Sequence, residues 1–352
     1  MHIIDRLESG GAERILLTQS ALFAAKGHSV DIITTVAKGK LSSLIHKDVR
    51  LIVLHRKWKY NPIKILQLNR LLRQYDVLHI HGYHNMRYVW LAMQMGGIKG
   101  KTFYQEHHGA YNETFAVGKE QKKILQSINF IAVSHSITTW ANKQLMLPKR
   151  QIFLLQNTIL KQEGLKQTHR FNDTIQLLIT ANFTENKNIL FAIDVLKYSI
   201  QQSKRNMHLT IIGHINDEAY YHRVLTYIDA HQLIKNITIK TDITNVQEHL
   251  YQYDMALHCS IFESGPLVLI EYLAQGLPFI ASNTGEVVWQ IQNDFPEFIA
   301  EEMNVEKWYD KIRNLAMQNQ TLLEEKMYAC FAKHYSTEVY YQKCQHIYKN
   351  GV

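Results

Sequence analysis

The feature that most limits the fold of this chain is a repeated alternation between short apolar, β-branched runs and longer segments with helical periodicity. In the first half the apolar runs are residues 1–7, 30–34, 49–54, 77–80, 102–104 and 130–133. Gly27 follows the first helical segment, residues 12–26, at the position where a helix ends. Alternation of this kind predicts right-handed βαβ units and parallel sheets with helices on both faces.

A polar stretch, residues 156–173, interrupts this pattern and predicts a connection between two domains. The alternation restarts with the apolar runs 175–179, 209–213, 237–239 and 255–258, and the sequence is helical from about residue 305 onward. The 352 residues are about twice the ~150 of a typical domain. We therefore expect an α/β fold with Rossmann-like domains at 1–160 and 161–335, and a final helix, 336–352, that packs back toward the first domain.

Composition excludes several other classes of protein. The chain is 46% hydrophobic and 20% charged, which is typical of a folded protein and excludes a disordered one. No apolar run approaches the ~20 residues that a membrane-spanning helix needs, and the first residues read as a strand rather than a signal peptide. Cys259, Cys330 and Cys344 form no CxxC pair, which argues against a disulfide framework. A reducing, cytoplasmic location is expected.

The positive charge is confined to one half of the chain. Residues 1–165 carry 23 Lys and Arg against 10 Asp and Glu, a net charge of +13, whereas the other residues have a net charge of −5. This asymmetry predicts that the N-terminal half meets a polyanion.

A patch of cations and amphipathic aromatic residues follows the third predicted strand. It consists of Arg56, Lys57, Trp58, Lys59 and Tyr60, and it suits the headgroups of an anionic membrane. An ordinary solvated loop explains the patch equally well. No nucleic-acid motif accompanies it, so we expect no nucleic-acid partner.

Two glycines, Gly10 and Gly11, follow the first predicted strand and precede a helix. They let the backbone approach a ligand closely, and the N–H groups of the helix start favour an anionic or hydroxyl-rich ligand. A tight turn without a ligand explains the same residues. The third glycine of a dinucleotide fingerprint is absent.

The densest signal is the segment FESGPLVLIE at residues 262–271. Pro266 suits the first position of a helix that Gly276 ends. Glu263 precedes this helix and Glu271 lies about one and a half turns along, so both carboxylates are expected to point toward one cleft. A carboxylate accepts two hydrogen bonds from a vicinal diol, and the helix start between them suits a phosphate. The alternative is a buried helix with two ordinary surface glutamates.

His79 and His81 lie two positions apart on a predicted strand, which places both imidazoles on one face. Metal hydrolases use this pattern. Because no matching third and fourth ligand stands out elsewhere in the sequence, we expect no metal site.

These motifs together resemble the family-4 retaining glycosyltransferases of the GT-B fold (glycosyl transferases group 1). The segment from Glu263 to Glu271, followed by YLAQGLP, is similar to the donor-site signature of that family. The GGAER loop, the strand VLHIH at 77–81, AVS at 132–134 and QNT at 156–158 resemble further family segments in the same order. The resemblance covers nearly the whole chain. It implies two facing Rossmann-like domains, with the acceptor on the first and the nucleotide sugar on the second.

The resemblance also implies roles in donor binding. Glu271 would bind the ribose, and Glu263 would contact the donor sugar near its reacting face. Backbone groups would contact sugar and phosphate at Gly265, Pro266, Leu267 and Val268.

Two positions concern the charge of the diphosphate. Lys187 matches the lysine with which the family neutralises it. Asn182 replaces the arginine of the family, and a neutral amide stabilises the charge of a leaving group less well. The Phe-Gly pair that follows the first glutamate in the family is also replaced, by Gly265 and Pro266.

In the first domain, QEHHG at 105–109 resembles the segment that carries the active-site histidine of the family. His108, directly before the glycine, is the better positional match and His107 the second. Such a histidine would stabilise developing charge, with the acceptor proton passing to the leaving phosphate. Gly10, Gly11 and His81 would form the acceptor or phosphate loop. A structural hydrogen-bonded histidine is the alternative.

The implied function is transfer of a hexose from a UDP- or GDP-sugar to a lipid-linked or cell-surface polysaccharide acceptor. Retention and independence from metals and other cofactors come from the resemblance. The alternatives are a nucleotide-sugar epimerase of the same fold and a non-catalytic nucleotide-sugar-binding homologue. The basic first half, which would hold the acceptor, favours a peripheral contact with the inner face of the plasma membrane.

Overall fold

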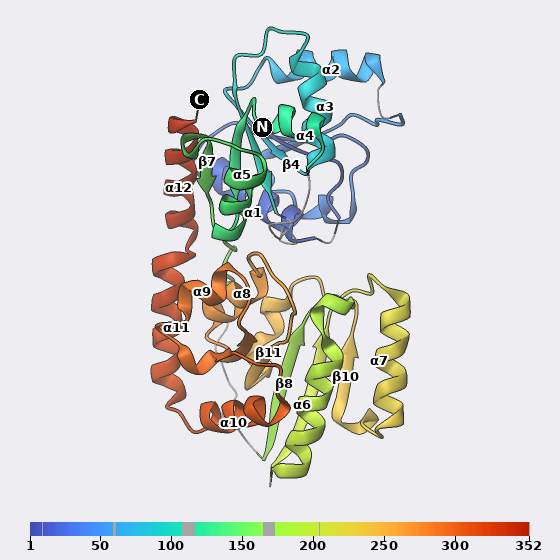
Figure 1. Cartoon of the computed structure of the whole chain (residues 1–352), viewed down its shortest axis with the longest axis vertical. Helices are drawn as coiled ribbons and strands as arrows, with labels where there is room; N and C mark the ends of the chain where they lie inside the picture. Colours follow the sequence, from blue (N-terminus) through green and yellow to red (C-terminus); the bar gives the residue numbers. More distant parts are fainter. Residues whose placement is uncertain (9, 59–60, 108–116, 165–172, 204, 352) are drawn as a thin grey trace. The chain divides into compact units, whose positions relative to one another are not determined.

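The computed structural model describes residues 1–8, 10–58, 61–107, 117–164, 173–203 and 205–351. The chain forms two compact units, each with its own parallel sheet (Figure 1). One unit consists of Met1–Leu160 and Thr337–Val352, and the other of Lys161–Ser336. None of the described helices is both long enough and apolar enough to cross a bilayer.

The first unit contains a seven-stranded sheet with the order β3-β2-β1-β4-β5-β6-β7. Its strands are β1 (His2–Ile4), β2 (Val30–Thr34), β3 (Val49–Val53), β4 (Val77–His81), β5 (Lys101–Glu106), β6 (Asn129–Ala132) and β7 (Ile152–Leu154). The intervening helices are α1 (Gly11–Ala25), α2 (Pro62–Leu72), α3 (Tyr83–Met93), α4 (Lys119–Leu125) and α5 (His135–Gln144), with 3-10 turns η1 (Lys40–Leu44) and η2 (Lys149–Gln151). The strand order reverses between β1 and β4, the position where open parallel sheets bind ligands at their carboxyl edge.

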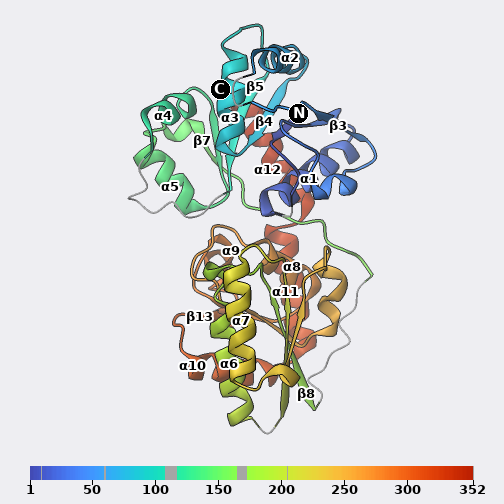
Figure 2. The same ribbon diagram turned by 90° about the vertical axis from the view of Figure 1, so that its right-hand side faces the viewer.

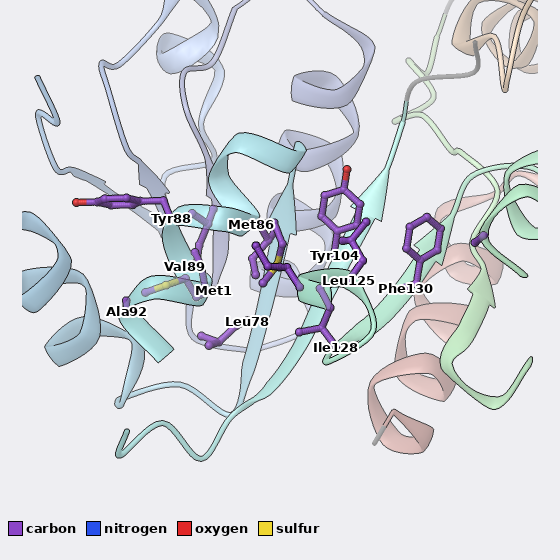
Figure 3. Packing of buried hydrophobic residues seen from close by; sticks show 14 of the residues in the cluster. Met1, Leu78, Met86, Tyr88, Val89, Ala92, Tyr104, Leu125, Ile128 and Phe130 are labelled. Carbon is purple, nitrogen blue, oxygen red and sulfur yellow. The ribbon is translucent and has the colours of Figure 1, made fainter. Parts of the chain in front are cut away.

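Apolar side chains fill both faces of this sheet, as expected for buried parallel strands. On one face, helices α2 to α5 contribute residues such as Met86, Val89 and Leu125, which pack with Tyr104 of β5 (Figure 3). On the other face, the core contains residues of α1 and of a helix from the far end of the chain.

That helix, α12 (Thr337–Asn350), belongs to the first unit although it follows the second unit in sequence (Figure 1). Gln19 of α1 donates a hydrogen bond to the Tyr348 hydroxyl at 2.8 Å. Tyr340 and Ile347 are buried in the same apolar cluster as the side chains of α1. The first unit is therefore assembled from two separate segments of the chain.

The second unit contains a six-stranded parallel sheet with the order β10-β9-β8-β11-β12-β13. Its strands are β8 (Thr174–Thr180), β9 (Asn206–Ile212), β10 (Ile237–Lys240), β11 (Met255–His258), β12 (Phe279–Ser282) and β13 (Ile299–Ala300). Its helices are α6 (Ile189–Gln202), α7 (Glu218–Ala230), α8 (Leu267–Gln275), α9 (Glu286–Ile291), α10 (Val305–Ala316) and α11 (Gln320–His334), with 3-10 turns η3 (Glu185–Lys187), η4 (Ile234–Asn236), η5 (Val246–Gln252) and η6 (Pro296–Phe298). Helices α6 and α7 cover one face of this sheet, and α8 and α11 cover the other (Figure 2).

The alternation read from the sequence is confirmed by the two parallel sheets. The strand predicted at 30–34 has the bounds of β2, and the run 255–258 has those of β11. Strands β7, β12 and β13 were not predicted, because they are short and carry no alternating pattern, although Gly276 and Pro278 mark the start of β12. Pro266 stands just before helix α8 rather than at its first position, and Gly276 ends this helix in a left-handed conformation with φ of 69°.

Candidate active site

The candidate donor site lies at the carboxyl edge of the second sheet, where β8 and β11 are neighbours. Two loops leave these strands: residues 181–188 follow β8 and residues 259–266 follow β11. This is the point where the strand order reverses, and open parallel sheets bind ligands there. The loops carry the sequence-predicted residues Asn182, Lys187 and Glu263.

Lys187 and Glu263 join the two loops as an ion pair, in which the Lys187 ammonium donates to Glu263 Oε1. Their side chains are 27% and 12% exposed. Burial raises the pKa of the Glu263 carboxyl, but Lys187, the largest opposing cause, acts together with His258 and a hydrogen bond from Ser260 to bring the pKa below its usual range. Glu263 is therefore ionised at neutral pH.

His258, the last residue of β11, is a third polar group at this position. Its Nε2 lies 3.6 Å from Glu263 Oε1, beyond a normal hydrogen bond. Burial lowers the pKa of His258 to about 4, although the Glu263 carboxylate opposes this effect. The imidazole is neutral at pH 7, and the carboxylate depends on Lys187 for its compensating charge.

Asn186 fixes the two loops against each other. Its side chain donates to the Phe262 carbonyl at 2.8 Å and accepts from the Phe262 N–H at 3.1 Å, while its own carbonyl accepts from Ile261 at 2.8 Å. These three bonds hold the backbone directly before Glu263.

A third loop, after β12, also contacts Glu263. The Glu263 N–H donates to Thr284 Oγ1 at 3.1 Å. Gly285 has φ of +87°, and a Cβ there would lie 2.9 Å from the Glu263 Cβ and 3.2 Å from Pro266 Cδ. Position 285 therefore requires glycine for its backbone conformation and for the space it leaves to Glu263.

Helix α8 begins directly after the loop of residues 259–266. Because Pro266 has no side-chain acceptor, it does not cap the first N–H groups of the helix. These groups and the helix dipole favour an anion at this end. Glu271 lies farther along α8 and is 8% exposed.

Asn182 lies in the same loop as Lys187, but its side chain contacts the loop after β9. Its Oδ1 accepts a hydrogen bond from the His214 N–H at 3.1 Å. Glycine at position 213 lets the loop after β9 lie close to the loop after β8, since a Cβ at this position would lie 1.9 Å from the Ala181 carbonyl oxygen. Asn182 therefore has a structural hydrogen bond that an arginine would not make in the same way.

In the first unit, the corresponding edge brings together the ends of β1, β4 and β5. Gly10 precedes α1 without a side-chain cap, and Gly11 is the first residue of the helix. His81, the last residue of β4, is 1% exposed. Its Nδ1 lies 2.9 Å from Nε2 of His107, which follows β5, and the two rings stack. His108 lies outside the described residues.

A cavity of about 360 Å³ lies at this edge of the first sheet. Its lining residues are Asp5, Val36, Arg56, Lys57, Trp58, His84, Arg87 and Tyr88. The Arg56 guanidinium lies 4.7 Å from the centre of the Tyr88 ring, and its buried Nε has no hydrogen-bond partner among the described residues. Trp58 is 75% exposed. Lys59 and Tyr60, the other residues of the basic patch, lie outside the described residues.

Two family models together match nearly the whole chain. The model described as Glycosyltransferase Family 4 matches residues 9–159, and the model described as Glycosyl transferases group 1 matches residues 161–329. The chain is a group 1 glycosyltransferase.

This glycosyltransferase is similar to a capsular polysaccharide biosynthesis glycosyltransferase, CapH, of Staphylococcus aureus, with 22% identity over 294 residues, or 81% of each chain. Its structure resembles that of a glycosyltransferase from Rickettsia africae, with a TM-score of 0.76, 19% identity and coverage of 99% and 97% of the two chains. It also resembles Anabaena HepE in complex with UDP and glucose, with a TM-score of 0.79, 13% identity and coverage of 98% of each chain. The fold is GT-B.

In the glycosyltransferase, the predicted donor residues fall into one connected region of the second unit. Lys187 pairs with Glu263, Gly265 and Pro266 directly precede α8, and Leu267 and Val268 are its first two residues. Sequence reasoning did not find His258, Asn186 or Gly285, which hold or neighbour Glu263. The signals for His258 and Gly285 were present: a histidine at the end of an apolar strand and a glycine directly before a helix.

Proposed function

We propose that this glycosyltransferase transfers a hexose from a UDP- or GDP-sugar to a lipid-linked or cell-surface polysaccharide acceptor, with retention. The observation that carries the proposal is the Lys187–Glu263 pair beside the uncapped start of α8. A cation and a helix N-terminus suit a diphosphate, and a carboxylate suits sugar hydroxyls. The likeness to HepE with UDP and glucose and to CapH supports the same classes of donor and product.

In this proposal, the diphosphate of the donor replaces Glu263 as the ion-pair partner of Lys187. The lysine then neutralises the charge that develops on the leaving phosphate, and the first N–H groups of α8 add to this effect. The released Glu263 carboxylate accepts hydrogen bonds from the sugar near its reacting face, while Glu271 accepts those of the ribose. Because Lys187 and the helix supply positive potential at the diphosphate, the transfer is proposed to need no metal or other cofactor.

The acceptor is proposed to bind the first unit. Arg56 and Lys57 at the cavity beside β3 suit a phosphate-bearing acceptor, and Trp58 suits a sugar ring or a lipid surface. This patch is also proposed to contact an anionic membrane from the cytoplasmic side. His107, held by His81, and His108 are the proposed residues for stabilising charge at the reacting centre.

One observation favours a second candidate, a nucleotide-sugar-binding homologue with little turnover. Asn182 stands where the family has an arginine, so the leaving phosphate has one cationic group fewer. The variant Asn182→Arg separates the two candidates. A transferase gains turnover from the added charge, whereas a binding protein gains affinity for the nucleotide and still releases no product.

The decisive experiment has two stages. A thermal-shift screen with UDP-, GDP-, ADP- and dTDP-sugars identifies the donor, because a ligand that binds the native state raises Tm. That donor is then incubated with and without a polyprenyl-diphosphate-linked sugar. Release of nucleoside diphosphate only with the acceptor supports the proposal. Isomerisation of the sugar without any acceptor would indicate an epimerase, and binding without release a non-catalytic homologue.

A further inference from the structure

Three histidines lie together in the core of the first unit, whereas the proposed donor site belongs to the second unit. His2 of β1 is the register partner of His79 on the neighbouring strand β4, and His81 follows two residues along on the same face. All three side chains are buried. One ring nitrogen from each residue lies within 4.8 Å of the others. The sequence analysis found no third ligand for His79 and His81, and the fold supplies it in His2.

Hydrogen bonds occupy the outer nitrogens of two of these rings. His79 Nδ1 lies 2.7 Å from the Tyr348 hydroxyl of α12, and His81 Nδ1 lies 2.9 Å from His107 Nε2. The remaining nitrogens are His79 Nε2 and His81 Nε2, the second of which lies 3.2 Å from His2 Nδ1. Histidines that bind metals commonly have their non-ligating nitrogen held in this way.

The inner side of the cluster contains polar atoms that lack well-formed hydrogen bonds. His79 Nε2 and the two amide atoms of the buried Gln105 make no hydrogen bond of normal geometry to a described residue, and Gln105 interacts only weakly with the side chains of His79 and Tyr340. Gln105 on β5 is the register partner of His81. A buried polar group without a partner costs about 1–3 kcal/mol, so such atoms point to a missing ligand.

A cavity of about 790 Å³ reaches this cluster. His2 and His79 line it, together with α12 residues such as His346 and Tyr348. The cavity gives a small ion access to the buried imidazoles.

We propose that His2, His79 and His81 bind one divalent transition-metal ion of the Zn²⁺ class. Imidazole nitrogens are preferred ligands of zinc, and three histidines leave a fourth position for a water that the Gln105 oxygen can accept from. Tetrahedral Zn–N bonds of about 2.1 Å bring ligand nitrogens to roughly 3.4 Å from one another. The His79 and His81 rings, now stacked with centroids 4.6 Å apart, would tilt so that the ligand nitrogens converge to this separation.

The bound ion would join β1 to β4 and, through the Tyr348 hydrogen bond, fix α12 on the sheet. Its role is therefore structural. The proposal stands apart from the donor site, and its failure would leave the proposed transferase activity unaffected.

Metal binding by the full, untagged chain tests the proposal directly. The protein is freed of metal with a chelator and titrated with Zn²⁺ alone, and with Co²⁺ for its absorption spectrum. One tightly bound equivalent, a raised Tm and the intense visible bands of four-coordinate Co²⁺ are expected. His79→Gln and His2→Gln should each weaken binding at least tenfold. His346→Gln, an exposed histidine at the same cavity, should leave affinity unchanged.

Two results would overturn the proposal. One is a wild-type chain that takes up no tightly bound equivalent or gives only a six-coordinate Co²⁺ spectrum. The other is an unchanged affinity for Zn²⁺ in both His79→Gln and His2→Gln. That result would assign the ion to surface histidines. Where His79→Gln does not fold, the wild-type titration and His2→Gln decide between these outcomes.

Discussion

Lys187 and Glu263 form an ion pair across 76 positions of sequence, and the pair ties the loop after β8 to the loop after β11. Glu263 is the more buried partner, and the nearby His258 is neutral at pH 7. The charge of the Glu263 carboxylate is therefore balanced mainly by one lysine. A ligand that competes for this lysine changes the electrostatics of Glu263 at the same time.

The first prediction concerns the pH dependence of this pair. In Lys187→Met, Glu263 stays buried without its cation, which should cost about 2 kcal/mol of stability near pH 7. Lys187 holds the pKa of folded Glu263 below its unfolded value of 4.5. The stability it confers is thus present above pH 4.5 and is lost as pH falls through the folded pKa.

Thermal melts from pH 4 to 8 measure this effect. The Tm difference between wild type and Lys187→Met should be largest near neutral pH and narrow below about pH 4.5. Lys307→Met is the matched control, because its pair with Glu302 is 60% and 61% exposed and should contribute little. Equal effects of the two variants at every pH would contradict the prediction.

Glu263→Gln is expected to reduce turnover about 100-fold, while the Kd of the donor nucleotide changes less than about threefold. The amide keeps the size of the side chain but loses the negative charge near the reacting sugar. Steady-state kinetics and calorimetric titration with the nucleotide separate the two quantities. Full turnover in this variant would remove Glu263 from the reaction and support a binding protein.

Glu271→Ala should weaken nucleotide-sugar binding at least tenfold, because hydrogen bonds to a charged group are worth about 1.5–3 kcal/mol. Glu271 is buried on α8, so the variant must first be shown to fold by its thermal melt. Isothermal titration with the intact donor then measures affinity. Unchanged affinity would disprove the donor-site assignment of this helix.

Two glycines with nearly the same positive φ angle provide a further test of how Glu263 is positioned. Gly285 has φ of +87° and Gly27 has φ of +86°, but only at Gly285 would a Cβ crowd Glu263 and Pro266. Both alanine variants should lose stability from the positive φ, Gly27→Ala by about 1 kcal/mol and Gly285→Ala by more, because Gly285 has ψ of 158° and a crowded Cβ position. Only Gly285→Ala should also lose turnover, which initial rates determine. Equal turnover in both variants would show that crowding of Glu263 by the added Cβ does not affect the reaction.

The basic patch gives a prediction for membrane binding. Lys57→Glu and Trp58→Ser together should weaken binding to vesicles that contain anionic lipid by at least tenfold, since each cation near such a surface contributes about 1 kcal/mol. Co-sedimentation with anionic and zwitterionic vesicles measures this. Lys149→Glu, an exposed cation elsewhere on the first unit, is the control. Equal binding of all variants, or of wild type to both vesicle types, would refute the membrane contact.

The sequence was a good guide to the sheets and to the helix that starts the donor site. Strands such as β2 and β11 carry dense β-branched or apolar runs, and Gly276 ends α8 as predicted. These are local signals, in which the residues that form the element also mark its limits.

Other features depend on contacts between distant segments and had no local signal. The support that Asn186 and Gly285 give to Glu263 exists only once three loops meet at one edge of the sheet. The place of His2 beside His79 follows from the pairing of β1 with β4, which no spacing in the sequence encodes. Sequence reasoning finds such partners only after the strand order is known.

Because the first unit is assembled from both ends of the chain, its folding depends on the order of synthesis on the ribosome. Its apolar layer over α1 is completed by Tyr340, Cys344 and Ile347 of α12, which are translated after the whole second unit. The second unit, from Lys161 to Ser336, is continuous and can close its core earlier. The part of the chain made first is thus the last to finish folding, and during translation a vacant apolar surface on α1 awaits the final helix.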